Sequence, residues 1–207
     1  GLVFQIHPYE TGLDNTPPWM NELHQHARPW WISAVEKLPL NWFVNIIRRD
    51  TRALPPGQRM ENVDALLSWN IIRRLRRKHY DINKIMHGSV FLIEDVSFNA
   101  IFVRNNAVLR DIAAVARIKL PEDLLRNMEL TEQALDSLWE EKYGLYFSRD
   151  FSSHDLLQEP TVAGLMPLYA GTISPERAKR LVQVLTNHHA FGLKYPVPSV
   201  PRTSRSF

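Results

Sequence analysis

The sequence predicts an all-α protein built from antiparallel helical hairpins. Glycine is scarce, at 8 of 207 residues, while proline is common, at 14. This mix disfavours a strand-rich fold with many tight turns and suits helices joined by proline-containing connections. Apolar side chains recur at helical spacing along much of the chain, and no convincing pair of strands is found. The chain is therefore expected to pack as a bundle, a solenoid or a closed α/α toroid.

The first helix is expected to begin at the Asn15-Thr16-Pro17-Pro18 stretch and to run to about Ala27. Asn15 or Thr16 can cap it, and proline suits the first helical position because its missing N–H would be unpaired there anyway. A second helical stretch is expected from Ile32 to Arg48, with a break or restart at Pro39. Residues 51–59 contain Pro-Pro-Gly and are expected to form a loop.

Four more helices are expected further along the chain. Pro121 opens one of them, with Glu122 and Asp123 beside the positive end of its dipole, and Gly144 ends it. Another begins at Ser174-Pro175. In the helix that begins at Ser174, the expected buried residues are Ala178, Leu181, Val182 and Leu185. The other two helices are expected over residues 61–79 and 96–118, and the second of these has Ile101, Val108, Ile112 and Val115 on one face. Asp95 is expected to cap the helix that follows it. An extended piece is expected at 145–147 and a helical turn at 164–169.

Composition excludes several classes of site. The chain has no cysteine, so it has no disulfide framework and no thiolate metal site, and a reducing cytosol is mildly favoured. No apolar run approaches the roughly 20 residues that span a bilayer, so no membrane association is expected. The N-terminus lacks an initiator Met and the features of a signal peptide, which suggests a processed product or an internal fragment.

The net charge of +3 arises mainly from one basic helix. Its cations lie between apolar positions at helical spacing, which favours the solvated face of an amphipathic helix, and a phosphate-binding surface is the alternative. Nucleic acid is not expected as a partner. The cations are Arg73, Arg74, Arg76, Arg77 and Lys78.

The segment richest in chemistry runs from His7 to Trp19, with the sequence HPYETGLDNTPPW. It holds two carboxylates, an imidazole and two aromatic rings, in a loop that leads into a helix. Sugar sites need carboxylates to move protons and flat aromatic faces to stack on a pyranose ring. The alternative is structural: Asp14 forms an Asx-turn or cap before the prolines, and Tyr9 and Trp19 lie in the core.

This segment resembles the motif His-Pro-Trp-Glu-Ser-Gly-Met/Leu-Asp-Asn-Ser-Pro-Arg-Trp of glycoside hydrolase family 63 and its trehalase-like relatives, which holds the general acid. Asp14 occupies the position of that acid. Tyr9 replaces the family's Trp and keeps a stacking surface, and Pro18 replaces its Arg, which removes a cation. Further stretches resemble the same family in the same order: RRDTR at 48–52, EDVSFNAI at 94–101, LW and GLY within 138–146, GLMPLYAG at 164–171 and VPSVP at 197–201.

The resemblance implies an inverting α-glycosidase on a six-hairpin α/α toroid, of which residues 1–207 would form the N-terminal to middle part of one catalytic domain. The family's general base is a Glu after a Tyr-Trp-Arg-Gly-Pro stretch, and these 207 residues lack that stretch. The isolated chain is therefore expected to be inactive or nearly so, with a second chain or a C-terminal segment completing the barrel.

The implied substrate is a small glycoside such as mannosylglycerate or glucosylglycerate, with oligosaccharides left open. Tyr9, Gly12 and Trp19 are the expected sugar contacts. Arg48 and Arg49 are expected to bind an anionic aglycone, since a guanidinium forks onto a carboxylate, and the alternative is a cation at a helix end. No cofactor and no metal are expected, because adjacent histidines do not suit a helical metal site. The alternative from another class is a non-catalytic helical-hairpin domain that binds a protein partner.

Overall fold

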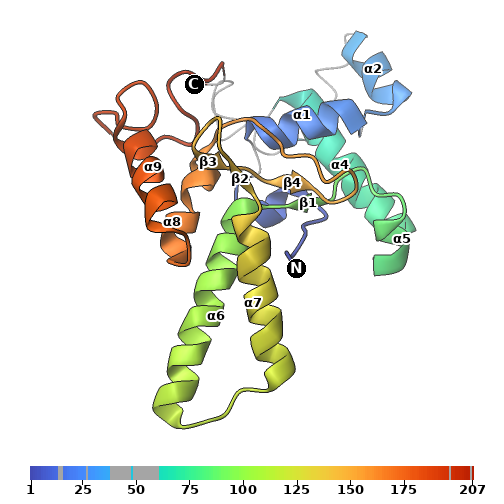
Figure 1. Ribbon diagram of the computed structural model, residues 1–207. Coiled ribbons are helices and arrows are strands. Elements are labelled where there is room, and N and C mark those ends of the chain that lie inside the picture. Colours follow the sequence, from blue (N-terminus) through green and yellow to red (C-terminus); the bar gives the residue numbers. More distant parts are fainter. Residues whose placement is uncertain (14–15, 27, 38–47, 49–60, 196, 206) are drawn as a thin grey trace. The chain divides into compact units, whose positions relative to one another are not determined.

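The computed structural model describes residues 1–13, 16–26, 28–37, 48, 61–195, 197–205 and 207. The chain forms two compact units, one of residues 6–92 and one of residues 1–5 and 93–207. Helices dominate both units (Figure 1), which confirms the all-α prediction. None of the described helices combines the length and apolarity needed to cross a bilayer. That residues 1–207 belong to one catalytic domain stays a prediction.

The unit of residues 6–92 is centred on α4 (Asn62–Arg77). Helices α1 (Pro17–His26) and α2 (Trp30–Lys37) both pack against α4. A short 3-10 helix, η1 (Pro8–Thr11), precedes α1, and α5 (Ile82–Met86) follows α4. Most buried positions of α4 recur three or four residues apart and so lie on one side of the helix; the buried residues are Asp64, Leu67, Ser68, Asn70, Ile71 and Leu75.

Two of the helices expected in this unit are confirmed, at residues 17–26 and 62–77. The second helix begins at Trp30 and its described part ends at Lys37, while the expected loop at 51–59 lies outside the described residues. Helix α5 was not expected, because five residues carry too little periodicity to be recognised. It is capped by Asp81, whose side chain accepts a 3.2 Å hydrogen bond from the Lys84 backbone N–H.

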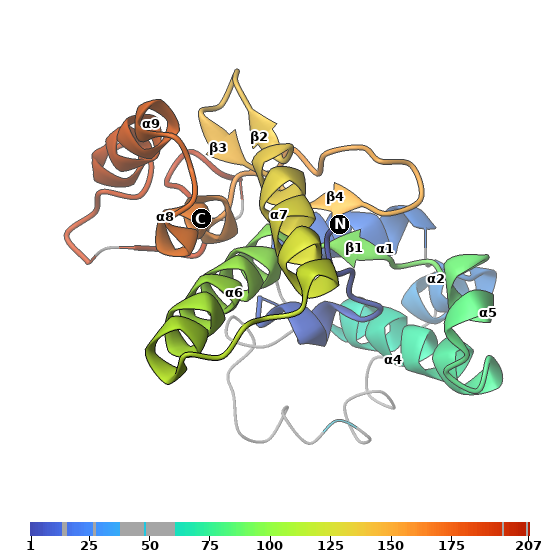
Figure 2. The ribbon, with the colours of Figure 1, turned by 60° about the horizontal axis from the view of Figure 1, so that its bottom comes forward.

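The second unit is built on a helical hairpin. Helices α6 (Val96–Ala116) and α7 (Glu122–Asp136) lie side by side in Figures 1 and 2. The 3-10 helix η4 (Val162–Leu165) and helix α8 (Pro167–Ala170) pack on α6. Helix α9 (Pro175–Thr186) begins where the sequence predicts, with the Ser174 hydroxyl accepting from the Arg177 backbone N–H.

The expectation that no strands pair is wrong. Strand β1 (Ile93–Glu94) pairs antiparallel with β4 (Arg149–Asp150), and β2 (Trp139–Glu140) pairs antiparallel with β3 (Leu145–Tyr146). Two residues per strand are too few to produce an alternating sequence pattern.

The helix expected to reach Gly144 ends instead at Asp136. The apolar residues after Asp136 continue the helical spacing, but tertiary contacts place Trp139 in β2 instead of in the helix. The Arg177 guanidinium stacks over the Trp139 ring at 5.2 Å and donates to the Asp136 carbonyl at 3.0 Å, so α9 holds the end of α7. Gly144 closes the β2–β3 turn with a φ of +62°, a conformation that few other residues adopt without strain.

The apolar face expected on α6 is present but largely exposed. Ile101 is 42% exposed, Ile112 58% and Val115 86%. The buried side chains of α6 are smaller or polar and lie on its other face, among them Ala100, Val103 and Asn106. The stripe expected in α9 is buried only in part, since Leu181 is inaccessible whereas Val182 is 47% exposed.

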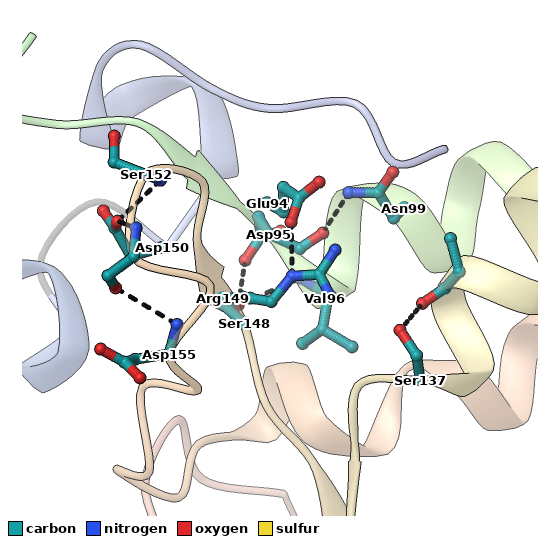
Figure 3. Close-up of polar contacts among 12 residues, drawn as sticks. Glu94, Asp95, Val96, Asn99, Ser137, Ser148, Arg149, Asp150, Ser152 and Asp155 are labelled. Atoms are coloured by element: carbon teal, nitrogen blue, oxygen red, sulfur yellow. Dashed lines mark hydrogen bonds and ion pairs between the residues drawn. The ribbon is translucent and has the colours of Figure 1, made fainter.

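A buried carboxylate organises the start of α6 (Figure 3). Asp95 is the predicted helix cap, and its Oδ1 accepts a 2.7 Å hydrogen bond from the Phe98 backbone N–H. Its Oδ2 accepts from the Ser148 hydroxyl at 3.1 Å, and the same hydroxyl oxygen accepts from the Val96 N–H. Burial raises the pKa of Asp95 to about 6, although these hydrogen bonds oppose the shift. Asn99 adds bonds to both the N–H and the carbonyl of Val3.

The stability of the Asp95→Asn variant relative to the wild type is expected to increase as the pH rises. In the folded protein the pKa of Asp95 is about 6, against 3.8 for an ordinary aspartate, so the folded state binds the proton more tightly. The stability that this proton contributes is complete below pH 3.8 and is lost as the pH rises through about 6. The shift of about two units corresponds to a loss of roughly 3 kcal/mol.

Urea unfolding of the full-length protein between pH 4 and pH 7 measures this effect. Asparagine keeps the capping oxygen but carries no charge. The free energy of unfolding of Asp95→Asn should therefore gain on the wild type as the pH rises. A difference between the two proteins that stays constant over this range would contradict the account.

Candidate active site

The His7–Trp19 segment is anchored to α4 by a buried imidazole. His7 Nδ1 accepts from the Tyr9 backbone N–H at 3.2 Å, and its Nε2 lies 3.2 Å from the Ser68 carbonyl oxygen. Because one ring nitrogen accepts, the other must carry the proton, and the network assigns it to Nε2. His7 thereby caps η1 and fixes it to a residue 61 positions further along the chain.

The Glu10 carboxylate is bound by the backbone. Its Oε2 accepts from the Ile6 N–H at 2.7 Å and from the His7 N–H at 3.2 Å. With His7 it forms a capping box around η1. Glu10 is therefore held in place as a structural acceptor at the beginning of the segment.

Two threonines fix the chain on either side of residue 14. The Thr11 hydroxyl donates to the Pro8 carbonyl at 2.8 Å and accepts from the Leu13 N–H at 3.1 Å. The Leu13 carbonyl then receives the Thr16 hydroxyl at 2.8 Å and the Thr16 N–H at 3.2 Å. Helix α1 follows directly, since the Thr16 carbonyl accepts from the Trp19 N–H at 3.1 Å. Asp14 itself lies outside the described residues, and its role as general acid stays a prediction.

The three expected sugar contacts lie in different surroundings. Tyr9 is 51% exposed, and its ring meets the His7 ring edge-on at 4.5 Å. Gly12 is exposed, has a φ of +72° and has open space where a side chain would begin. Trp19 is only 1% exposed and packs edge-on against Phe91 at 6.1 Å, so its ring belongs to the core of the unit. Its indole N–H has no hydrogen-bond partner among the described residues.

The basic residues expected to bind the aglycone are described in part. Arg48 is half-buried, and its Nη1 donates to the Asn62 side-chain oxygen at 2.9 Å, next to the start of α4. Arg49 lies outside the described residues.

Further along α1, the histidines bind carboxylates. His24 Nε2 lies 2.7 Å from the Asp64 carboxylate of α4, and His26 lies 3.4 Å from the Glu22 carboxylate one turn back. In the part of the chain that the structure describes, no three His, Asp or Glu side chains are grouped to hold a metal ion.

Together these contacts describe polar, hydrogen-bonded turns on either side of residue 14, with an exposed phenol ring beside them. Such a ring can present a flat apolar face to a sugar. Sequence reasoning missed the anchoring roles of His7 and Glu10. The capping-box pairing of these two residues, three positions apart, was the local signal for them, whereas nothing local indicates the contact between His7 and Ser68.

Comparison with known proteins gives consistent matches. The family model of the mannosylglycerate hydrolase MGH1-like glycoside hydrolase domain matches residues 1–207. The chain is 35% identical over 210 residues to a mannosylglycerate hydrolase of Thermus thermophilus, covering all of this chain and 46% of that protein. It is 25% identical over 215 residues to a glucosylglycerate hydrolase of Mycolicibacterium hassiacum, covering all of this chain and 45% of that protein.

Solved structures agree. The chain superposes with a TM-score of 0.82 and 32% identity on a GH63 mannosylglycerate hydrolase from Thermus thermophilus in complex with Tris and D-glycerate. The match covers 99% of this chain and 46% of that one, so the chain spans less than half the length of these relatives. The chain has the fold of the corresponding part of that α/α-toroid enzyme, as predicted.

Replacing Thr16 with valine should loosen the loop, whereas serine should not. Valine keeps the shape of threonine but removes the O–H that the Leu13 carbonyl accepts. We expect Thr16→Val to lower the free energy of unfolding by about 1 kcal/mol, the usual worth of one such hydrogen bond. Thr16→Ser retains the donor and serves as the matched control. Equal stabilities of the two variants in urea unfolding would show that this bond does not anchor the loop.

Proposed function

Because its family model matches it throughout, the chain belongs to the mannosylglycerate hydrolase MGH1-like glycoside hydrolase domain family, and we propose that the protein hydrolyses a small α-glycoside such as mannosylglycerate or glucosylglycerate. The names of its relatives support this substrate class. The structural observation that carries the proposal is the anchored loop, in which Leu13 and Thr16 are hydrogen bonded to each other on either side of Asp14. A fixed position is what a group that protonates a leaving oxygen requires.

In this proposal Asp14 is the general acid of an inverting hydrolysis. It protonates the glycosidic oxygen while a second carboxylate activates a water on the opposite face of the sugar. That second carboxylate lies outside these 207 residues, so the chain alone is proposed to be inactive or nearly so. Segments beyond it would complete the barrel and the acid–base pair.

The remaining residues are given supporting roles. Tyr9 offers an exposed ring for the sugar, and Gly12 leaves room for the substrate to approach the backbone. Arg48 and Arg49 are proposed to face the glycerate carboxylate. Trp19 lies in the core, so we assign it the support of α1 beneath the loop in place of direct stacking. A cytoplasmic location is part of the proposal and rests on the cysteine-free composition.

A non-catalytic interaction domain is the second candidate, favoured by the apolar side chains that α6 leaves exposed. Ile112 and Val115 are 58% and 86% exposed. In the hydrolase proposal the missing part of the toroid covers this face. The two candidates differ in what a change at residue 14 does: the interaction domain predicts an effect on stability alone.

Asp14→Asn in the full-length protein is expected to lower kcat for mannosylglycerate or glucosylglycerate hydrolysis by about 10²- to 10⁴-fold, the usual contribution of a general acid. The unfolding midpoint should stay within a few degrees of the wild type. Glu10→Gln is the matched control, because the amide oxygen still accepts from the backbone, and it should retain most of the activity. Full activity of Asp14→Asn would refute the assignment.

The stereochemistry of the product tests the inverting mechanism separately. Proton NMR of the first turnovers resolves the anomers of the released sugar. We expect the β-anomer to form first from an α-glycoside, because water attacks the face opposite the leaving group. Initial release of the α-anomer would show retention and exclude an inverting mechanism.

A further inference from the structure

A basic pocket lies at the end of α1 that is remote from the Asp14 loop. It has a volume of about 360 Å³ and lies where the end of α1, the start of α2 and the face of α4 meet. The ten residues of α1 separate it from the loop by about 15 Å at 1.5 Å per residue. Four guanidinium groups and an indole ring line it, from Arg28, Arg73, Arg74, Arg77 and Trp31.

Among the described residues, most of the positive charge of the pocket has no acidic partner. Arg28 forms an ion pair with Glu36, but Arg73, Arg74 and Arg77 form no ion pair with the described residues. Arg77 lies three and four positions after the other two, so the three cations share one side of α4. The pKa of the neighbouring Lys78 is lowered from its ordinary value, first by burial and then by repulsion from Arg74. Grouped like charges of this kind favour a bound anion.

Arg73, which lines the pocket, carries a hydrogen-bond donor that no described residue satisfies. Arg73 is half-buried, and its Nε–H is shielded from solvent without a hydrogen-bond partner among the described residues. Its guanidinium lies over the Trp69 ring at 5.6 Å, and Trp69 meets Trp31 edge-on at 6.3 Å. The two indole rings thus limit where the Arg73 side chain can lie, which reduces the entropy lost when an anion binds.

We propose that this pocket binds a phosphate-bearing anion. A phosphoryl group offers several oxygens to the planar donors of two or more guanidinium groups, whereas a single carboxylate accepts one such fork. The volume exceeds that of inorganic phosphate and accommodates a phosphate ester beside the Trp31 ring. The site is separate from the proposed hydrolase site and does not depend on it.

Arg76 provides the matched comparison on the same helix. It carries the same charge and is exposed, but it does not line the pocket. If the arginines served only as a solvated face, the four cations of this helix would be interchangeable. The pocket predicts that they are not.

Isothermal titration of the full-length protein with inorganic phosphate, at constant ionic strength, tests the proposal. We expect saturable binding to the wild type, and binding at least about tenfold weaker to Arg74→Gln/Arg77→Gln, which loses charge-assisted hydrogen bonds. Arg76→Gln should bind phosphate as the wild type does. Sulfate should compete with phosphate, while acetate and glycerate should not.

Arg73→Lys is the second variant, because it keeps the charge but loses the fork, and it should also weaken binding if the double variant fails to fold. Absence of saturable phosphate binding to the wild type would overturn the proposal. Equal weakening by Arg76→Gln, or equal affinity for acetate, would overturn it as well, because either result would indicate attraction by net charge alone.

Discussion

The hydrogen bonds that the Leu13 carbonyl accepts from Thr16 fix the junction on which the proposed chemistry depends. They join Leu13, before the proposed acid, to Thr16 at the start of α1. The preceding turn is held in the same way, by Glu10 bound to two backbone N–H groups and by His7 bound to α4. The described side chains of His7, Glu10, Thr11 and Thr16 thus all serve to position the chain. The role of Asp14 in proton transfer remains a proposal.

The second unit is organised by a buried carboxylate. Asp95 is inaccessible to solvent, and its carboxylate joins the first turn of α6 to Ser148, 53 residues away. Beside it, Glu94 forms a 2.6 Å ion pair with Arg149 across the β1–β4 pair. Burying a carboxylate in this way is costly, as the raised pKa of Asp95 records. The buried carboxylate instead favours one arrangement of the chain, because a shift of β4 and the adjoining Ser148 would leave the Asp95 carboxylate without its partner.

The sequence predicted what depends on local chemistry. The proline pair at the start of α1, the Ser174 cap of α9 and the Asp95 cap of α6 follow from the backbone groups left free at helix ends. It did not predict the end of α7 or the contact between His7 and Ser68, since both depend on partners distant in the chain. The sequence left the place of Trp19 open between a sugar contact and the core, because a ring that can stack on sugar can equally pack against a side chain such as Phe91. The roles of Asp14 and Arg49 rest on the family resemblance.

The most direct test of the central claim compares two leaving groups in the full-length protein. A glycerate leaving group needs a proton as the bond breaks, whereas 2,4-dinitrophenolate leaves without one. If Asp14 is the general acid, Asp14→Asn should lose about 10²-fold or more in kcat/KM with the glycerate glycoside but recover most of the wild-type rate with the dinitrophenyl glycoside. An equal loss with both substrates would contradict the claim and assign residue 14 to structure or binding.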